Sequence, residues 1–170
     1  MFRKINSGQP LSEIAKGMSR NIHIRTHFTN ILLNNPTLST INMSTEDMEL
    51  ALIRYMCLLK YNDTKDLDTS QILYEDFSII ELTKYCTYID DLLNKIQDLS
   101  SFDSNRSKST GLPHLLWDLG RFNLNNEQQK KYIDLFSSKY SSSLTNNRNF
   151  NRNRIRFFKN FSDDLLKEIQ

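Results

Sequence analysis

The chain of 170 residues is 38% hydrophobic and 25% charged, and it contains only four glycines and three prolines. This length and composition are typical of one globular domain with its own core, and they exclude collagen-like, disulfide-scaffold and wholly disordered chains. No apolar run approaches the roughly 20 residues that span a bilayer, and the basic N-terminus lacks the apolar core of a secretory signal. We therefore expect a soluble, intracellular protein without a membrane partner, in which residues 1–170 form a single helical domain.

The amino-acid usage is biased in a way that bears on structure more than on function. The chain has no valine and only two alanines, whereas leucine, isoleucine, asparagine, serine and lysine are plentiful. This bias is typical of an AT-rich genome, so the abundance of asparagine says little about function. The absence of valine removes a leading strand former, while leucine and lysine remain good helix formers.

The first two predicted helices are short. Pro10 can start one that ends at Gly17, because proline is tolerated in a first helical turn. Apolar residues from Ile24 to Leu32 indicate a second helix. Since Pro36 disfavours the helical conformation of the residue before it, this second helix should stop near Asn34-Asn35.

Two stronger helices follow. The first runs from Met48 to Leu59, begins after Ser44 and ends at Asn62-Asp63. The second carries apolar residues three and four apart from Ile79 to Ile96, and Ser78 followed by Glu81 predicts a capping box at its start. Its heptad-spaced face can serve either as the core of this bundle or as an interface for a partner helix.

The second half of the chain begins with a predicted loop. Residues 99–110 are rich in serine and have no apolar periodicity, so we expect a mobile loop inside the domain. A leucine-rich helix should then start at Pro113 and end at Gly120. Asn125-Asn126 predicts the cap of the next helix, which Ser141-Ser142-Ser143 should end.

The C-terminal segment 146–170 is predicted to be a basic and aromatic helix. Its phenylalanines and Leu165 fall within one arc of a helical wheel. No alternating strand pattern competes with helical periodicity anywhere in the chain, so the expected fold is an all-α bundle of about six to seven helices.

The net charge of +2 hides a separation of charge along the chain. Residues 1–43 carry +4, residues 44–98 carry −7 and residues 99–170 carry +5. Such basic and acidic regions either orient a partner or face each other across the bundle.

The most specific feature is a cluster of five cations without an acid in residues 146–159. On a helix, four of them are spaced by four, four and three residues and form one stripe opposite the phenylalanine arc, whereas Arg154 falls inside that arc and must extend to solvent or pair with a carboxylate of the acidic middle region. Arginine offers paired donors that match phosphate oxygens. The predicted nucleic-acid-binding residues are Arg148, Arg152, Arg154, Arg156 and Lys159.

These patterns lead to two functional hypotheses. The leading one is a non-catalytic helical subunit of a larger complex, which binds the backbone of RNA or DNA through this arginine stripe. The alternative is a protein–protein scaffold or interaction subunit that uses the acidic middle helices and the heptad face of residues 79–96.

Residues that could support catalysis or metal binding do not form a recognisable motif. His23 and His27 have a spacing that suits one metal ion, but a third ligand at useful spacing is missing. Cys57 and Cys86 are interpreted as reduced core residues, and His114 as a surface or boundary residue without an activated nucleophile beside it. We therefore expect no enzyme activity, no catalytic residues, no metal, no cofactor and no small-molecule substrate.

Overall fold

The computed structural model describes residues 22–27, 34–63, 65, 67, 71–72, 75–96, 98–102, 108–144 and 154–170. These residues contain seven helices and no strand, which confirms the predicted all-α bundle. The helices are α3 (Ile22–His27), α4 (Pro36–Ser39), α5 (Thr45–Tyr61), α7 (Ile79–Lys95), α8 (Lys108–Arg121), α9 (Asn126–Leu144) and α10 (Arg154–Ile169).

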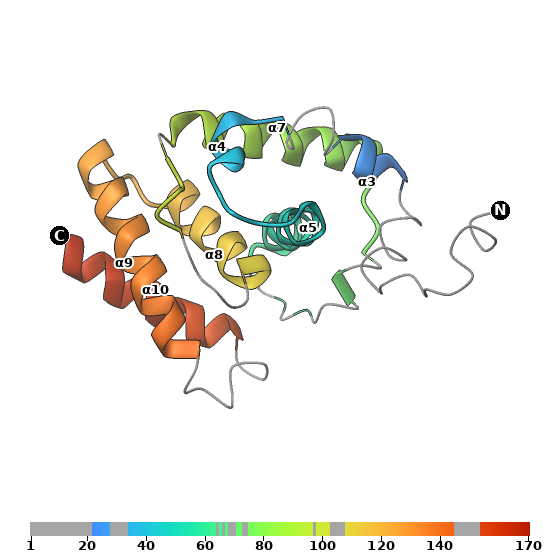
Figure 1. Cartoon of the computed structure of the whole chain (residues 1–170). Coiled ribbons are helices and arrows are strands. Elements are labelled where there is room, and N and C mark those ends of the chain that lie inside the picture. The colour runs from blue at the N-terminus through green and yellow to red at the C-terminus, as the bar shows by residue number, and fades with distance from the viewer. Residues whose placement is uncertain are drawn as a thin grey trace, which may run out of the picture.

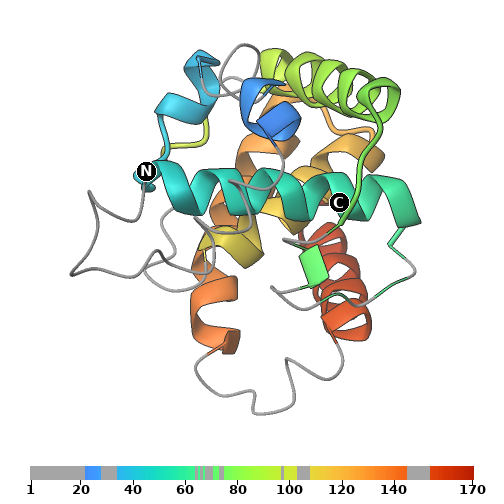
Figure 2. The ribbon, with the colours of Figure 1, turned by 90° about the vertical axis from the view of Figure 1, so that its right-hand side faces the viewer.

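Helix α5 lies at the centre of the arrangement. Figure 1 views it nearly end-on, with α7 and α4 above it, α8 beside it, and α9 and α10 beyond α8. Figure 2 shows the length of α5 crossing the molecule beneath α7. Helices α5 and α8 form the most extensive helix pair, and α10 packs on α9. Residues of α5, α8 and the start of α10 line one small cavity.

The predicted helix ends at α5 and α7 are confirmed. The hydroxyl of Ser44 accepts a hydrogen bond from the Asp47 amide, and Asn62 ends α5 in the left-handed conformation with φ 51°. At α7, the Ser78 and Glu81 side chains each accept a bond from the other residue's amide. These caps satisfy amides and carbonyls that a helix leaves without internal partners.

One prediction about proline is wrong, and a second proline has a role that was not predicted. Pro113 does not start its helix: α8 begins at Lys108 and carries Pro113 inside. Leu112 and Leu115 beside it are fully buried, and this packing outweighs the amide donor that proline lacks. Pro36, in turn, starts a short helix of its own, α4, whose cap is the Asn35 side chain.

Other boundaries also differ. Helix α9 continues through Ser141-Ser142-Ser143 to Leu144, and α10 begins at Arg154. The segment 145–153, the predicted helix between Pro10 and Gly17, and residues 28–33 lie outside the described residues.

The predicted mobile loop at 99–110 is wrong at both of its ends. Leu99 and Phe102 are buried in the core, and Phe102 packs against Phe136 of α9 with ring centroids 6.2 Å apart. The Leu99 amide donates to the Thr40 hydroxyl at 3.2 Å. Residues from Lys108 onward belong to α8, and 103–107 lie outside the described part of the chain. Periodicity missed the packing of these residues because their partners are far away in sequence.

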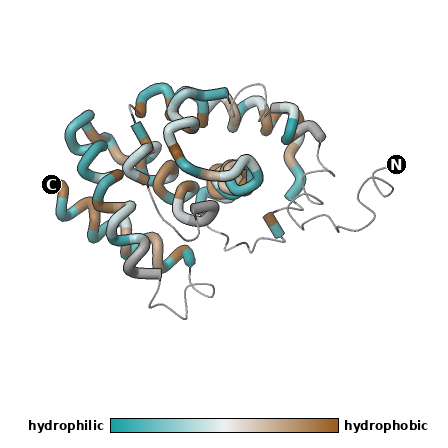
Figure 3. The backbone as a smooth tube through the Cα atoms, viewed as in Figure 1, coloured by the Kyte–Doolittle hydropathy of each residue, from teal (hydrophilic) through white to brown (hydrophobic). Residues whose placement is uncertain are grey.

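The heptad face of α7 is part of the protein's own core. Leu82, Ile89 and Ile96 are buried among the side chains of the same hydrophobic cluster as α5 and α8. Figure 3 shows the hydropathy of the residues along the chain. Hydrophobic residues lie along α5, whereas hydrophobic and hydrophilic residues alternate along α7, α9 and α10. Among the described residues, no helix combines the length and the apolar character that crossing a bilayer requires.

Candidate anion-binding site

The orientation of α10 determines where its cations point. Phe158 and Leu165 are buried, while Phe157 and Phe161 are partly buried against the same core. The ring of Phe158 stacks on His114 of α8, with centroids 3.5 Å apart and an angle of 6° between the planes. This contact fixes the rotation of the first turns of α10 about its axis, so inward and outward positions are well separated.

Arg154 lies on the inner side of α10, as its place within the phenylalanine arc indicates. Its side chain is half-buried, and Nη1 donates a hydrogen bond of 2.7 Å to the Leu67 carbonyl. The sequence predicts a contact with solvent or with a carboxylate of the acidic middle region. One acceptor shown by the structure comes from that region, and it is a backbone carbonyl.

Arg156 and Lys159 are exposed on the outer side of α10. They are three residues apart and therefore neighbours on the helix surface. Arg148 and Arg152, the other two members of the predicted stripe, lie outside the described residues. The described surface of α10 thus carries two of the four stripe cations, both beside its start.

A small cavity of about 30 Å³ lies behind the first turn of α10. Its walls come from α5, from the segment after α5, from α8 and from α10. Apolar side chains form part of the lining, and five polar residues complete it: Arg54, Asp63, Lys65, His114 and Arg154. Two arginines from distant parts of the sequence therefore line one cavity.

Arg54 is the member of this cluster that sequence reasoning missed. Only 6% of its surface is exposed, although arginine is rarely buried so completely. One signal was available: Arg54 is the only charged residue in the apolar run from Leu50 to Leu59. Neither its partners nor its proximity to Arg154, 100 positions later, follows from that signal.

His114 is not at the surface, contrary to the sequence interpretation. It is 5% exposed and held between the core and Phe158. Burial lowers the pKa of His114 well below its ordinary value, and the positive charges of Arg54, Arg154 and Arg121 lower it further. The imidazole is therefore neutral at neutral pH, and it adds hydrogen-bonding capacity to the cavity without a further charge.

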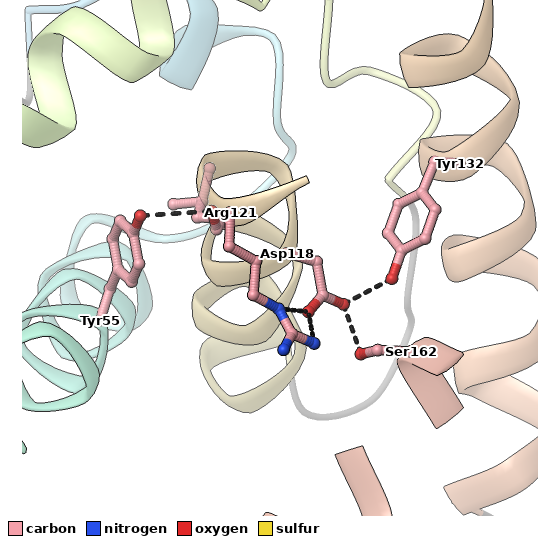
Figure 4. Close-up of polar contacts among 6 residues, drawn as sticks. Tyr55, Asp118, Arg121, Tyr132 and Ser162 are labelled. Carbon is pink, nitrogen blue, oxygen red and sulfur yellow. Dashed lines mark hydrogen bonds and ion pairs between the residues drawn. The ribbon is translucent and has the colours of Figure 1, made fainter. Parts of the chain in front are cut away.

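A second polar cluster is centred on Asp118 of α8 (Figure 4). Asp118 is 1% exposed. Its Oδ2 accepts hydrogen bonds from the hydroxyls of Tyr132 at 2.6 Å and Ser162 at 2.5 Å, and its Oδ1 accepts bonds from Arg121 at 2.8 and 3.1 Å. Burial raises the pKa of Asp118, against the effect of these donors.

The Asp118 cluster joins helices rather than offering a reactive group. Its donors come from α8, α9 and α10, and Tyr55 of α5 donates to the Leu116 carbonyl nearby at 3.2 Å. Asp118 does not line the cavity described above. Because both carboxylate oxygens already accept bonds inside a packed core, we assign this cluster to the mutual positioning of the helices that build the cavity.

The other candidate groups are the two cysteines and the possible metal ligands. Burial raises the pKa of the Cys57 thiol to about 12 and that of Cys86 to about 11, which disfavours the reactive thiolate. No group of three or more His, Cys, Asp or Glu side chains that could hold a metal ion occurs in the described part of the chain. The side chains of the predicted pair His23 and His27 lie outside that part.

Comparison of the chain with protein-family models, with curated proteins and with solved structures finds no match.

Proposed function

We propose that the protein binds the phosphate backbone of nucleic acid at the start of α10. The observation that carries this proposal is the exposed position of Arg156 and Lys159 on a helix whose rotation is fixed by Phe158. Cations on a helix that is already packed in place suit the regularly spaced phosphates of a nucleic-acid strand, because binding then requires little additional ordering of side chains and backbone.

The distribution of charge along α10 indicates which half of the helix the nucleic acid contacts. Beyond Lys159, the exposed side chains include Asp163, Asp164 and Glu168. A polyanion is attracted to the first half of the helix and repelled by the second half. The inward cations Arg54 and Arg154 add positive potential behind the same end. We therefore expect nucleic acid to cross the start of α10 rather than to follow the helix axis.

Fluorescence anisotropy with single- and double-stranded RNA and DNA over a range of salt concentrations tests the proposal. Each neutralised phosphate contributes about −0.9 to the slope of log K against log salt on duplex DNA and about −0.7 on single strands. Replacing Arg148, Arg152 and Arg156 with glutamine should reduce the slope by nearly three units on duplex DNA. Absence of detectable binding at low salt contradicts the proposal.

A second candidate function, a protein–protein module, is favoured by one observation. Ile79 and Ile80 at the start of α7 are 58% and 82% exposed, and Tyr88 lies two turns further along. The rest of the heptad face, from Leu82 to Ile96, does not support this candidate, because it is buried. Molar mass measured by light scattering at two concentrations distinguishes the candidates: a mass that rises with concentration supports an apolar interface, and a constant monomer mass removes self-association.

A further inference from the structure

Lys65, in the segment that follows α5, lies beside the start of α10. It lines the same small cavity as Arg154 and Ile155, and its side chain is exposed. Shortly after it, the Leu67 carbonyl accepts the 2.7 Å hydrogen bond from Arg154. This bond ties the segment to the first turn of α10, and both lie on the same lower side of the molecule in Figures 1 and 2. Lys65 is therefore a neighbour of the α10 cations in space, although it belongs to the acidic middle of the sequence.

The position of the Lys65 ammonium is set by Tyr61, the last residue of α5. Nζ of Lys65 lies 4.2 Å from the centroid of the Tyr61 ring. The Tyr61 hydroxyl donates a hydrogen bond to Glu75, so the ring is held at one end by the helix backbone and at the other by this bond. An ammonium over an aromatic ring is attracted to the ring face and keeps donors for other oxygens. Lys65 thus presents its charge from a defined place.

Lys60, a second lysine near the end of α5, has a different role. Its ammonium lies 3.0 Å from Glu75 Oε1 and donates at 2.7 Å to the Asp76 carbonyl. These contacts use Lys60 inside the fold and offset the charge of Glu75. Asp63 also lines the cavity, so this side of α10 is not uniformly basic. A phosphate contact here consequently depends on the particular position of Lys65.

The location of Lys65 favours one path across α10. Ile155, its neighbour at the cavity, directly precedes Arg156, and both Arg156 and Lys159 are exposed. The exposed acids further along the helix repel a polyanion. A strand that contacts the exposed pair therefore gains a further ion contact when it leaves α10 on the side of Lys65.

We propose that a nucleic-acid strand crossing the start of α10 continues onto the end of α5, where Lys65 contacts a backbone phosphate. The inference rests on the proposed function and adds to it one binding residue and a path. Lysine acts here as a point charge, so the contact carries no base specificity.

Single substitutions test the contact through the salt dependence of binding to duplex DNA, measured by fluorescence anisotropy. Lys65→Gln should reduce the magnitude of the slope of log K against log salt by about 0.9, whereas Lys65→Arg, which keeps the charge, should retain the wild-type slope. Lys95→Gln is the matched control, because it removes one exposed positive charge at the end of α7, on the opposite side of the molecule from the start of α10. This control should retain the wild-type slope as well.

A triple variant shows whether the cations act in one site. Adding Lys65→Gln to Arg156→Gln and Lys159→Gln should bring the total reduction from nearly two units to nearly three. Equal slopes for Lys65→Gln and Lys95→Gln, with the effect of the two α10 substitutions retained, overturn this inference alone. Failure of the proposed function has a different signature, because the wild-type protein then shows no binding at low salt, and that result overturns both.

Discussion

At the scale of single residues, the core contains polar side chains whose burial was not predicted from the sequence. Arg54, His114 and Asp118 are each less than a tenth exposed, and they come from the two helices, α5 and α8, that pack most extensively. Their positions could not be predicted from the sequence, because helical periodicity assigns charged side chains to the solvent side. For Asp118, hydroxyl donors from α9 and α10 compensate for the burial, and His114 stacks on Phe158 of α10.

The Asp118 cluster yields a stability prediction. Tyr132→Phe removes a buried hydroxyl that donates to the carboxylate, while it keeps the ring that packs against Phe136. We expect a loss of about 1–3 kcal/mol in the free energy of unfolding, since the carboxylate loses one donor in a buried site. Urea denaturation of the two proteins measures the difference. The same midpoint for both would show that the hydroxyl contributes nothing.

His114 predicts how stability depends on pH. Its pKa is lowered on folding, so the unfolded chain binds more protons than the folded chain below the ordinary pKa of histidine. The contribution to stability is therefore fully present at higher pH and is lost as the pH falls below that ordinary value. The loss between pH 6.5 and 5 amounts to at most about 2 kcal/mol for one proton.

His114→Phe is the matched control for this pH dependence. Phenylalanine retains an aromatic ring to stack on Phe158 but cannot be protonated. Denaturation midpoints measured at several pH values should fall more steeply toward acid in the wild type than in the variant. Parallel curves for the two proteins would mean that other groups account for the acid sensitivity.

At the scale of secondary-structure elements, local signals predicted much of the fold and failed where packing intervenes. The caps of α5 and α7 follow from Ser44 and from the pair Ser78 and Glu81, whose contacts lie within four residues. The position of Pro113 inside α8 did not follow, because the burial of its leucine neighbours is a tertiary effect. Likewise, Phe102 has its partner on α9, so local composition wrongly predicted a loop there.

The two glycines of α8 test how closely this helix packs. A Cβ atom at Gly111 would lie 2.6 Å from the buried ring of Tyr140, whereas one at Gly120 would meet the hydroxyl of Tyr88, a side chain that is 43% exposed. Gly111→Ala should destabilise the protein by about 1–3 kcal/mol through overpacking. Gly120→Ala should cost less, because Tyr88 can move. Thermal denaturation of both variants checks this order, and the reverse order would contradict the packing of α8 on α9.

At the scale of the whole molecule, folding gathers cations that the sequence distributes over distant segments. Arg54 and Lys65 belong to the stretch with a net charge of −7, yet they line one cavity with Arg154 from the basic C-terminal stretch. Counting charge along the chain indicated the basic end as the place to look for a site. It could not indicate that Arg154 points inward while Arg156 points outward, because this division depends on how Phe158 seats α10 against α8.

The central claim is that the exposed start of α10 contacts a phosphate backbone, and a pair of double variants tests it most directly. The first double variant combines Arg156→Gln and Lys159→Gln at the start of α10. The control combines Lys130→Gln and Lys131→Gln, which change the net charge by the same amount near the start of α9, at the end of that helix far from the start of α10. The measurement is the salt dependence of binding to duplex DNA by fluorescence anisotropy. We predict that the α10 pair lowers the slope of log K against log salt by nearly two units and that the α9 pair leaves it unchanged. Equal slopes for the two double variants would contradict the claim.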